Sequence, residues 1–152
     1  MEIEIRKAMI SDVPVILDLI KGIAEYEKLL NQVEATENLL EQQLFIKRNA
    51  FVYLAFVNEK PVGFALYFYN FSTFKGKKGL YLEDLFILPE YRSKGIGEKL
   101  FDTLIEEAKT NNCGRMEWVC LNWNKPAIGF YKKKKAKSLD DWIIFRLDEN
   151  NF

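Results

Sequence analysis

Two glycines at positions 95 and 97 lie between an apolar run that ends at Pro89 and an amphipathic segment that begins at Ile96. Backbone N–H groups at a helix N-terminus have no intrahelical partner, and the helix dipole adds partial positive charge, so phosphate binds there readily. A tight turn with close helix packing gives the same pattern. The loop is not a P-loop, because no Gly-Lys-Ser/Thr follows a leading glycine, and it is not a dinucleotide fingerprint, because Leu100 fills the third glycine position.

Histidine is absent from the chain. This excludes nucleophile systems and zinc sites built on histidine, and the side chain most often used for proton transfer near neutral pH. The chemistry must therefore depend on carboxylates, tyrosines, amines or a bound cofactor, and we expect no metal site. Cys113 and Cys120 form no Cys-x-x-Cys pair, so both are predicted to be plain thiols, with Cys120 in the core of a strand.

Length and composition indicate one globular domain. The chain has 152 residues, of which 49% are hydrophobic and 29% charged, and we predict a single soluble domain over residues 1–152. Lys plus Arg equals Asp plus Glu at 22 each, so net charge favours neither nucleic acid nor an anionic membrane as a partner. The sequence shows neither a transmembrane segment nor an apolar signal core, which predicts a cytoplasmic protein.

The elements that would position the chemistry alternate along the chain. Hydrophobic periodicity predicts helices at about 11–26, 36–47, 96–108 and 124–134, and strands at 2–7, 50–57, 62–69, 80–88, 115–121 and 142–147. Residues 58–61 have the composition of a hairpin turn between two of these strands. The expected fold class is therefore mixed α/β, with a predominantly antiparallel sheet flanked by helices.

Two motifs resemble a known family. Tyr-Leu-Glu-Asp at 81–84 followed by Arg-x-x-Gly-x-Gly at 92–97, and Asn-Lys-Pro-Ala-Ile-Gly-Phe-Tyr at 124–131, resemble the GNAT superfamily of acetyl-CoA N-acetyltransferases. The pattern is most similar to spermidine/spermine (diamine) and thialysine acetyltransferases. Residues 19–21 and 26–27 extend the resemblance over nearly the whole chain. It departs at Lys135, where the family often has glycine, and at 138–142, which looks shortened.

The resemblance implies the GNAT fold, acetyl-CoA as co-substrate, a small cationic amine as acceptor, and a homodimer. Catalytic roles fall on Tyr131 and Glu83. The implied acetyl-CoA contacts are Leu85, Phe86 and Ile87 for the pantetheine arm, Arg92, Ser93, Lys94, Gly95, Ile96, Gly97 and Glu98 for the pyrophosphate, and Asn124, Lys125, Pro126, Ala127 and Tyr131 near the thioester. The implied acceptor contacts are Tyr26, Glu27, Glu83, Asp84, Glu117 and Trp118, with Asp140 or Asp141 as further candidates.

Glu83 and Asp84 are two charges inside an apolar run, and such charges need partners. An alkyl ammonium has a pKa of ~10.4 and an ordinary glutamate one of ~4.3, so direct proton transfer between them costs roughly 8 kcal/mol. We therefore interpret Glu83 as holding the ammonium and passing its proton to water, unless burial raises the glutamate pKa. A solvated strand carboxylate is the less favoured interpretation.

Tyr131 suits the other end of the reaction. A phenol of pKa ~10 can protonate a departing thiolate, whose conjugate thiol has a pKa of ~8.5, at a mismatch of about 2 kcal/mol. Asn124 lies seven residues earlier, on the same face of the predicted helix. An isolated tyrosine is more often a core residue, but the surrounding motif favours the acid.

Alternatives remain. A protein lysine or N-terminal acetyltransferase would need a peptide-wide groove, and a non-catalytic CoA-binding module would be expected to lack Tyr131 or Glu83. The lysines at 132–135 are interpreted mainly as a solvated face and residues 75–78 as a hairpin tip. Aromatic residues between 67 and 74 are predicted to lie in the sheet core or at a subunit interface.

Overall fold

A computed structural model describes residues 1–152, and the chain divides into two compact parts, Met1–Val119 and Cys120–Phe152, each of which is described by itself. The first part holds a five-stranded sheet in the order β1-β2-β3-β4-β5. The strands are β1 (Ile3–Lys7), β2 (Phe51–Val57), β3 (Lys60–Ser72), β4 (Lys77–Ile87) and β5 (Met116–Glu117). The pairs from β1 to β4 are antiparallel and β4 with β5 is parallel, which confirms the predicted fold class.

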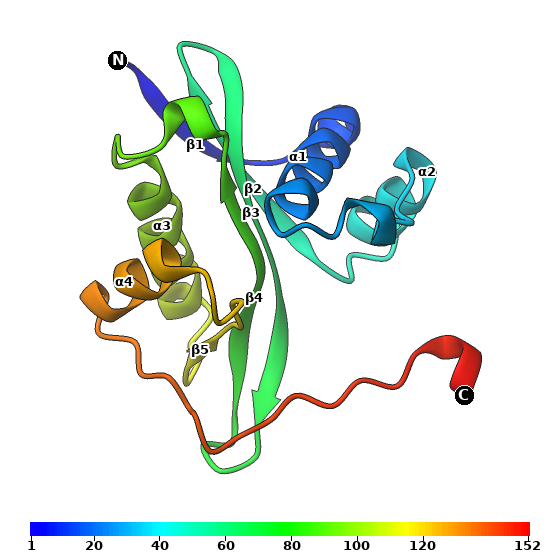
Figure 1. Ribbon diagram of the computed structural model, residues 1–152, viewed down its shortest axis with the longest axis vertical. Helices are drawn as coiled ribbons and strands as arrows, with labels where there is room; N and C mark the ends of the chain where they lie inside the picture. The colour runs from blue at the N-terminus through cyan, green and yellow to red at the C-terminus, as the bar shows by residue number, and fades with distance from the viewer. The chain divides into compact units, whose positions relative to one another are not determined.

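Helices cover both faces of this sheet (Figure 1). One face carries α1 (Val13–Tyr26) and α2 (Glu37–Leu40), and the other carries α3 (Ile96–Thr110). The predicted helix at 36–47 does begin after Thr36, whose hydroxyl accepts a hydrogen bond from the Leu39 N–H at 3.2 Å, but it continues beyond α2 as a π-helix over Glu41–Ile46. Short 3-10 turns are Ile10–Asp12, Leu30–Gln32, Pro89–Tyr91 and Glu149–Asn151.

The apolar stripe of α3 is buried as its spacing predicts. Ile96, Leu100 and Leu104 are at most 1% exposed. On the opposite face of the sheet, Ile16 of α1 and Leu54 and Phe64 of the strands form a second, fully buried core. Burial of such side chains stabilises the fold by roughly 1.5–3 kcal/mol each, so both helix layers are held firmly to the sheet.

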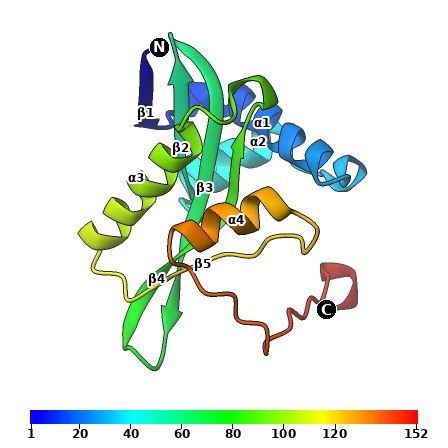
Figure 2. The same ribbon diagram turned by 60° about the vertical axis from the view of Figure 1, so that its left-hand side comes forward.

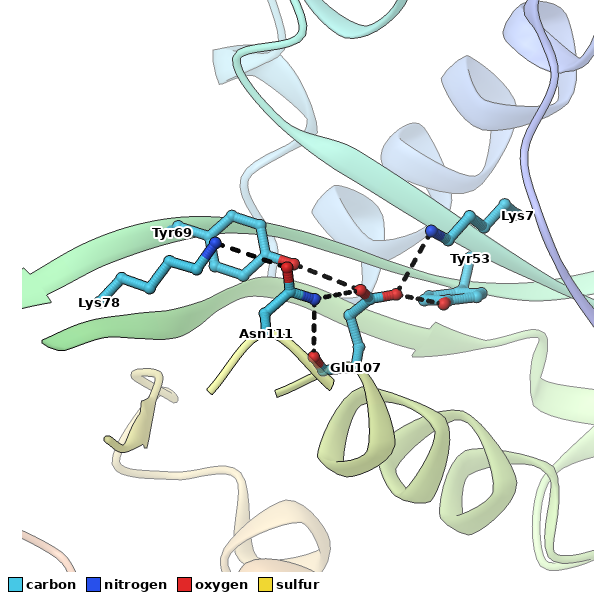
Figure 3. A network of polar contacts seen from close by, with 6 residues as sticks. All are labelled: Lys7, Tyr53, Tyr69, Lys78, Glu107 and Asn111. Atoms are coloured by element: carbon cyan, nitrogen blue, oxygen red, sulfur yellow. Dashed lines mark hydrogen bonds and ion pairs between the residues drawn. The ribbon is translucent and has the colours of Figure 1, made fainter. Parts of the chain in front are cut away.

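A single carboxylate near the C-terminal end of α3 fastens that helix to three strands (Figure 3). Glu107 accepts hydrogen bonds from the Tyr53 hydroxyl at 2.5 Å, the Asn111 amide at 2.6 Å and the Tyr69 hydroxyl at 3.4 Å. The Lys7 ammonium lies 3.5 Å from the same carboxylate. Burial opposes ionisation of Glu107, but the Tyr53 hydrogen bond and the Lys7 charge hold its pKa below its ordinary value. This network fixes α3, and therefore the loop before it, relative to the sheet.

The second part contains α4 (Lys125–Lys133), close to the predicted bounds. The Asn124 side chain caps it by accepting a hydrogen bond from the Ala127 N–H at 3.4 Å. The helix ends at Lys133, and Lys135, two residues further on, has a φ of 67° in the left-handed region that favours glycine. Lys135 thus adopts a conformation that glycine adopts more easily, at the position where the sequence departs from the glycine that the family resemblance implies.

Two predicted strands are wrong in extent or existence. Strand 115–121 is reduced to β5, and Cys120, expected in a strand core, is exposed, although neither cysteine is in a disulfide. Residues 142–147 form no strand, and Trp142 and Phe145 are 79% and 87% exposed. Apolar and β-branched residues supply strand propensity, but a strand also needs a neighbour for its N–H and C=O groups, and the second part contains no sheet.

Candidate active site

The glycine loop joins β4 to α3 through backbone that only some residues adopt easily. Gly95 is the N-cap of α3 with φ 82°, and Ser93 has φ 60°. A Cβ added at Gly97 would contact nothing closer than Ile87 Cγ1 at 3.8 Å, so packing inside the protein does not require glycine there. The first bond of α3 runs from the Lys99 N–H to the Gly95 carbonyl at 3.1 Å, which places the N–H groups of Ile96 and Gly97 ahead of it. The loop therefore offers both donors and space for a pyrophosphate.

The edge of β4 that faces away from β3 is unpaired over most of its length. β5 pairs with it at Leu80 and Tyr81 alone. From Leu82 to Ile87 this edge has no strand partner, and the predicted pantetheine contacts at 85–87 lie on it. An unpaired strand edge presents backbone donors and acceptors to an extended ligand, which suits the amide groups of a pantetheine arm.

Arg92 connects three elements around this edge. Its Nε donates to the Ile87 carbonyl at 2.9 Å, so one of the backbone groups predicted to serve the pantetheine arm already has a partner. The guanidinium lies over the Tyr26 ring, 4.7 Å from its centre, and over the Phe86 ring at 5.4 Å. The role of Arg92 in binding the pyrophosphate stays a prediction, and these contacts show that its guanidinium also connects α1, β4 and the loop.

A β-bulge sets the direction of the acidic residues in β4. The pairing register shifts between Leu66 and Tyr67 of β3, which face Asp84 and Leu82, so Glu83 is the extra residue. Bulges re-aim side chains and occur often beside active sites. Leu82 is buried, Glu83 is exposed and Asp84 is half-buried.

These carboxylates and Glu27, at the end of α1, influence one another. Burial, and after it the charges of Glu83 and Glu27, raise the pKa of Asp84 to about 7. Burial and then Glu83 also raise the pKa of Glu27. Tyr81 has a raised pKa through burial, Glu83 and Glu117. The structure thus brings the predicted acceptor contacts of α1 and β4 into one negatively charged region.

Two further predicted acceptor contacts lie at the end of β5: Glu117 is its last residue and Trp118 follows it. Glu117 is paired with Arg115 at 3.2 Å, so its charge is partly compensated. The Trp118 ring packs edge-on against Phe101 of α3, with 5.3 Å between the ring centres. The pairing of Arg115 with Glu117 was not foreseen, although their spacing of two residues on one strand puts them on the same face.

The predicted contacts near the thioester belong to the second part. Asn124, Lys125, Pro126, Ala127 and Tyr131 all lie at or within α4. The Tyr131 ring contacts Phe130, with 5.6 Å between the ring centres, and the Tyr131 carbonyl accepts a hydrogen bond from the Ala136 N–H at 3.1 Å. Each of these roles, like those in the first part, stays a prediction.

No group of three or more His, Cys, Asp or Glu side chains is arranged to hold a metal ion. None of the helices combines the length and apolar character needed to cross a membrane.

Solved structures with the same architecture define the class of fold. An integron cassette protein from the mobile metagenome of V. cholerae superposes with a TM-score of 0.81 at 28% identity, over 99% of this chain and 95% of the other. An aminoglycoside acetyltransferase from an uncultured soil metagenomic sample superposes equally well, with a TM-score of 0.81, over 96% of this chain and 95% of the other, at 19% identity. At this identity the second likeness shows the fold alone.

Sequence comparison gives the family. The profile of the Acetyltransferase (GNAT) family matches residues 18–135. The bovine thialysine N-epsilon-acetyltransferase is 36% identical over 95% of this chain and 91% of its own length. The human spermidine/spermine N(1)-acetyltransferase-like protein 1 is 35% identical over 95% of this chain and 22% of its own length. The chain therefore belongs to the GNAT acetyltransferase family and is an acetyl-CoA-dependent N-acetyltransferase.

Proposed function

We propose that this enzyme transfers the acetyl group of acetyl-CoA to a primary amine of a small cationic acceptor, a polyamine, a diamine or a thialysine-like amino acid. The observation that carries the proposal is the cluster of Glu27, Glu83 and Asp84, in which burial and mutual repulsion raise two of the pKa values. A bound cation stabilises the ionised carboxylates of such a cluster, so cation binding is favourable. The names of the bovine and human relatives point to acceptors of the same chemical class.

The two adjacent carboxylates of β4 divide the work on the amine. Glu83, which is exposed, attracts and holds the ammonium. Asp84, with a pKa of about 7 before the acceptor binds, is the better matched proton acceptor. When the acceptor ammonium binds beside Asp84, its positive charge favours the ionised carboxylate. When the acceptor nitrogen loses that charge, burial again favours protonation of Asp84. Against an amine of pKa ~10.4 the remaining gap is roughly 3 units, or about 5 kcal/mol, instead of 8.

Tyr131 is proposed as the acid that protonates the departing thiolate of the donor. We also propose that residues 1–152 act as a single catalytic domain. The loop of Gly95 and Gly97 and the unpaired edge of β4 would hold the pyrophosphate and the pantetheine arm of acetyl-CoA.

A protein lysine or N-terminal acetyltransferase is the alternative enzyme. Free-thiol release from acetyl-CoA distinguishes the two when spermidine, putrescine, thialysine, lysine and an unstructured lysine-containing peptide are compared at equal concentration. We expect kcat/KM for one of the free amines to exceed that of the peptide at least tenfold. A preference for the peptide would overturn the acceptor class, and CoA binding without turnover on any amine would indicate a non-catalytic module.

The role of Tyr131 is tested by Tyr131→Phe, which keeps the ring and removes the hydroxyl alone. A positioned general acid contributes 10²–10⁴-fold, so we expect turnover to fall by about two orders of magnitude. Acetyl-CoA affinity and melting temperature, measured on the same preparation, should stay close to those of the parent. A loss of turnover below about tenfold would remove Tyr131 from the mechanism, and a large loss of melting temperature would make it a core residue.

A further inference from the structure

A cavity of about 380 Å³ lies where the segment between β1 and α1 meets the end of the π-helix and the start of β2. In Figure 2, α1 and the helix of α2 that continues as the π-helix lie on the far side of the sheet. The volume of the cavity is within the range of sites for small molecules. Its lining consists of residues 8–10, 44–45, 48 and 50–52, which are apolar with one exception, Arg48.

The inner wall of this cavity is the buried core of the first part of the chain. Leu44 and Val52 are each 6% exposed and belong to that core. Met9 and Ile10 line the same cavity and are open to water, at 54% and 48% exposure. Three further lining residues are partly buried and pack against the core: Ala8, Phe45 and Ala50. An apolar group that enters the cavity therefore moves from water onto apolar side chains, which is favourable.

Arg48 is the single charged residue of the lining, and its guanidinium forms no ion pair with a carboxylate. The acidic residue that follows the lining segment 8–10 most closely in the chain is Asp12, and its partners lie elsewhere. The Asp12 carboxylate accepts hydrogen bonds from the Arg6 guanidinium at 2.8 Å and from the Met9 N–H at 2.7 Å. Arg48 is therefore an uncompensated cation beside an apolar cavity, and an anion is the ligand that would compensate it.

The backbone holds Arg48 in place beside an open strand edge. Its φ of 53° is in the left-handed region, which is uncommon and costly for a residue with a side chain. Asn49 fixes this turn, because its N–H donates to the Gln43 carbonyl at 2.9 Å and its side-chain amide to the Gln43 side-chain oxygen at 2.6 Å. The last hydrogen bond on the β1 side of β2 reaches the Val52 carbonyl, at 2.9 Å. The N–H of Ala50, two residues earlier along this edge, has no acceptor and is a second donor at the cavity.

We propose that this cavity binds a small carboxylate with an apolar body, at a site separate from that of the amine acceptor. The Arg48 guanidinium, which can donate two parallel hydrogen bonds, and the Ala50 N–H hold the carboxylate. The apolar body lies in the cavity against Leu44 and Phe45. The 14 residues of α1 make a helix roughly 20 Å long, with the lining segment 8–10 just before its start and Glu27 just after its end. The two sites therefore lie at opposite ends of α1 and select ligands of opposite charge.

Calorimetric titration of the full chain with 4-phenylbutyrate tests the proposal. Arg48→Gln should raise the Kd about tenfold or more, because hydrogen bonds to charged groups are among the strongest. Arg48→Lys should give an intermediate Kd, since an ammonium keeps the charge without the two parallel donors. The matched control is Lys47→Gln, which removes a neighbouring exposed cation outside the lining and should bind like the parent. Acetate, which lacks the apolar body, and 4-phenylbutyramide, which lacks the charge, should each bind about tenfold more weakly or less.

A second variant, Ala50→Leu, fills part of the cavity and leaves the Arg48 charge in place, so we expect it also to raise the Kd about tenfold. An unchanged Kd in Arg48→Gln or in a folded Ala50→Leu variant would overturn the proposal. Absence of saturable binding to the parent up to about 10 mM ligand would overturn it as well. Saturating CoA or spermidine should leave the Kd unchanged, and displacement by either would place the probe in the donor or acceptor site instead. These measurements need no turnover, so their failure leaves the proposed acetyl transfer intact.

Discussion

Two carboxylates in the first part of the chain, Glu107 of α3 and Asp84 of β4, have very different surroundings. Glu107 receives hydrogen bonds from two tyrosines and an asparagine and lies beside Lys7, and its pKa is held below the ordinary value (Figure 3). Asp84 has no hydrogen-bond donor or basic partner, and has two other carboxylates near it, and its pKa rises to about 7. Both residues are partly removed from water, so the difference comes from their neighbours.

The fold itself uses the charge of Glu107, whereas the charge of Asp84 remains for a ligand. Buried carboxylates are normally paired, and the protein meets that requirement fully at Glu107. At Asp84 the requirement is unmet inside the first part of the chain, at a place where an ammonium would satisfy it. Substitutions at Asp84 and Glu107 can show whether the two carboxylates differ in function as they differ in surroundings.

The largest effect is expected for Asp84→Asn, which removes the proposed proton acceptor while keeping the shape of the side chain. Turnover with the preferred amine should fall by about 10²-fold or more, since general bases contribute 10²–10⁴-fold. Acetyl-CoA affinity, measured by calorimetry, should change little. Turnover within threefold of the parent at pH 7.5 would end the assignment of Asp84 as the base and leave the proton to water.

A smaller loss is expected for Glu83→Gln, because an exposed carboxylate attracts the ammonium without taking its proton. We expect kcat/KM for a dicationic amine to fall about tenfold, mainly through KM. The dependence of KM on salt should also become shallower, because exposed charges are screened over ~8 Å at physiological ionic strength. Equal losses for the cationic amine and for a neutral-tailed amine of the same length would contradict this role.

Glu107→Gln should affect stability and leave catalysis nearly unchanged. Loss of a charge-assisted network costs about 2 kcal/mol, which lowers the melting temperature by roughly 5 °C in a chain of this size. We expect kcat/KM at 25 °C to stay within threefold of the parent. A large loss of turnover in a folded Glu107→Gln variant would break the distinction between the two carboxylates.

The smallest expected effect is on the pH dependence of folding stability, and it has opposite signs at Asp84 and Glu107. The Asp84 pKa is raised from 3.8 to about 7, so its contribution to folding stability is complete below pH 3.8 and is lost as pH rises through 7. The Glu107 pKa is lowered from 4.5, so its contribution is present above pH 4.5 and is lost on further acidification.

Between pH 5 and 8 the melting temperature of the parent without ligand should therefore fall by a few degrees, and that of Asp84→Asn should fall less. Between pH 4.5 and 3 the parent should lose more stability than Glu107→Gln. Identical pH profiles for the parent and Asp84→Asn would show that this carboxyl is solvated.

Local patterns predicted most of the first part of the chain. The stripe of Ile96, Leu100 and Leu104 specified α3, and Thr36 and Asn124 mark the starts of their helices as capping residues do. These features depend on residues three to eight positions apart. The segment 142–147 failed because a strand depends on a partner that its own sequence does not contain.

The candidate site residues are recognisable in the sequence, but their electrostatic surroundings are not. Glu83 and Asp84 stand out as charges in an apolar run, yet which of them has the raised pKa depends on the bulge opposite Leu66 and Tyr67. It also depends on Glu27, which is more than fifty residues away in sequence and close in space. The anchoring of Arg92 to the Ile87 carbonyl was missed for the same reason, since the motif alone indicates a phosphate ligand.

We expect Arg92 to make the two proposed substrate sites thermodynamically interdependent. The Arg92 guanidinium donates a hydrogen bond to the carbonyl of Ile87, the last residue of β4. The same guanidinium stacks on Tyr26, one residue before the acidic Glu27. A donor that orders the Arg92 loop therefore also orders the end of α1, and the acceptor meets a binding surface whose conformational entropy is already reduced. Linkage requires the reverse effect to be equal in size, so acceptor bound first must tighten the donor by the same factor. Steady-state kinetics of this enzyme should then show positive heterotropic coupling, with the KM of each substrate falling as the other approaches saturation.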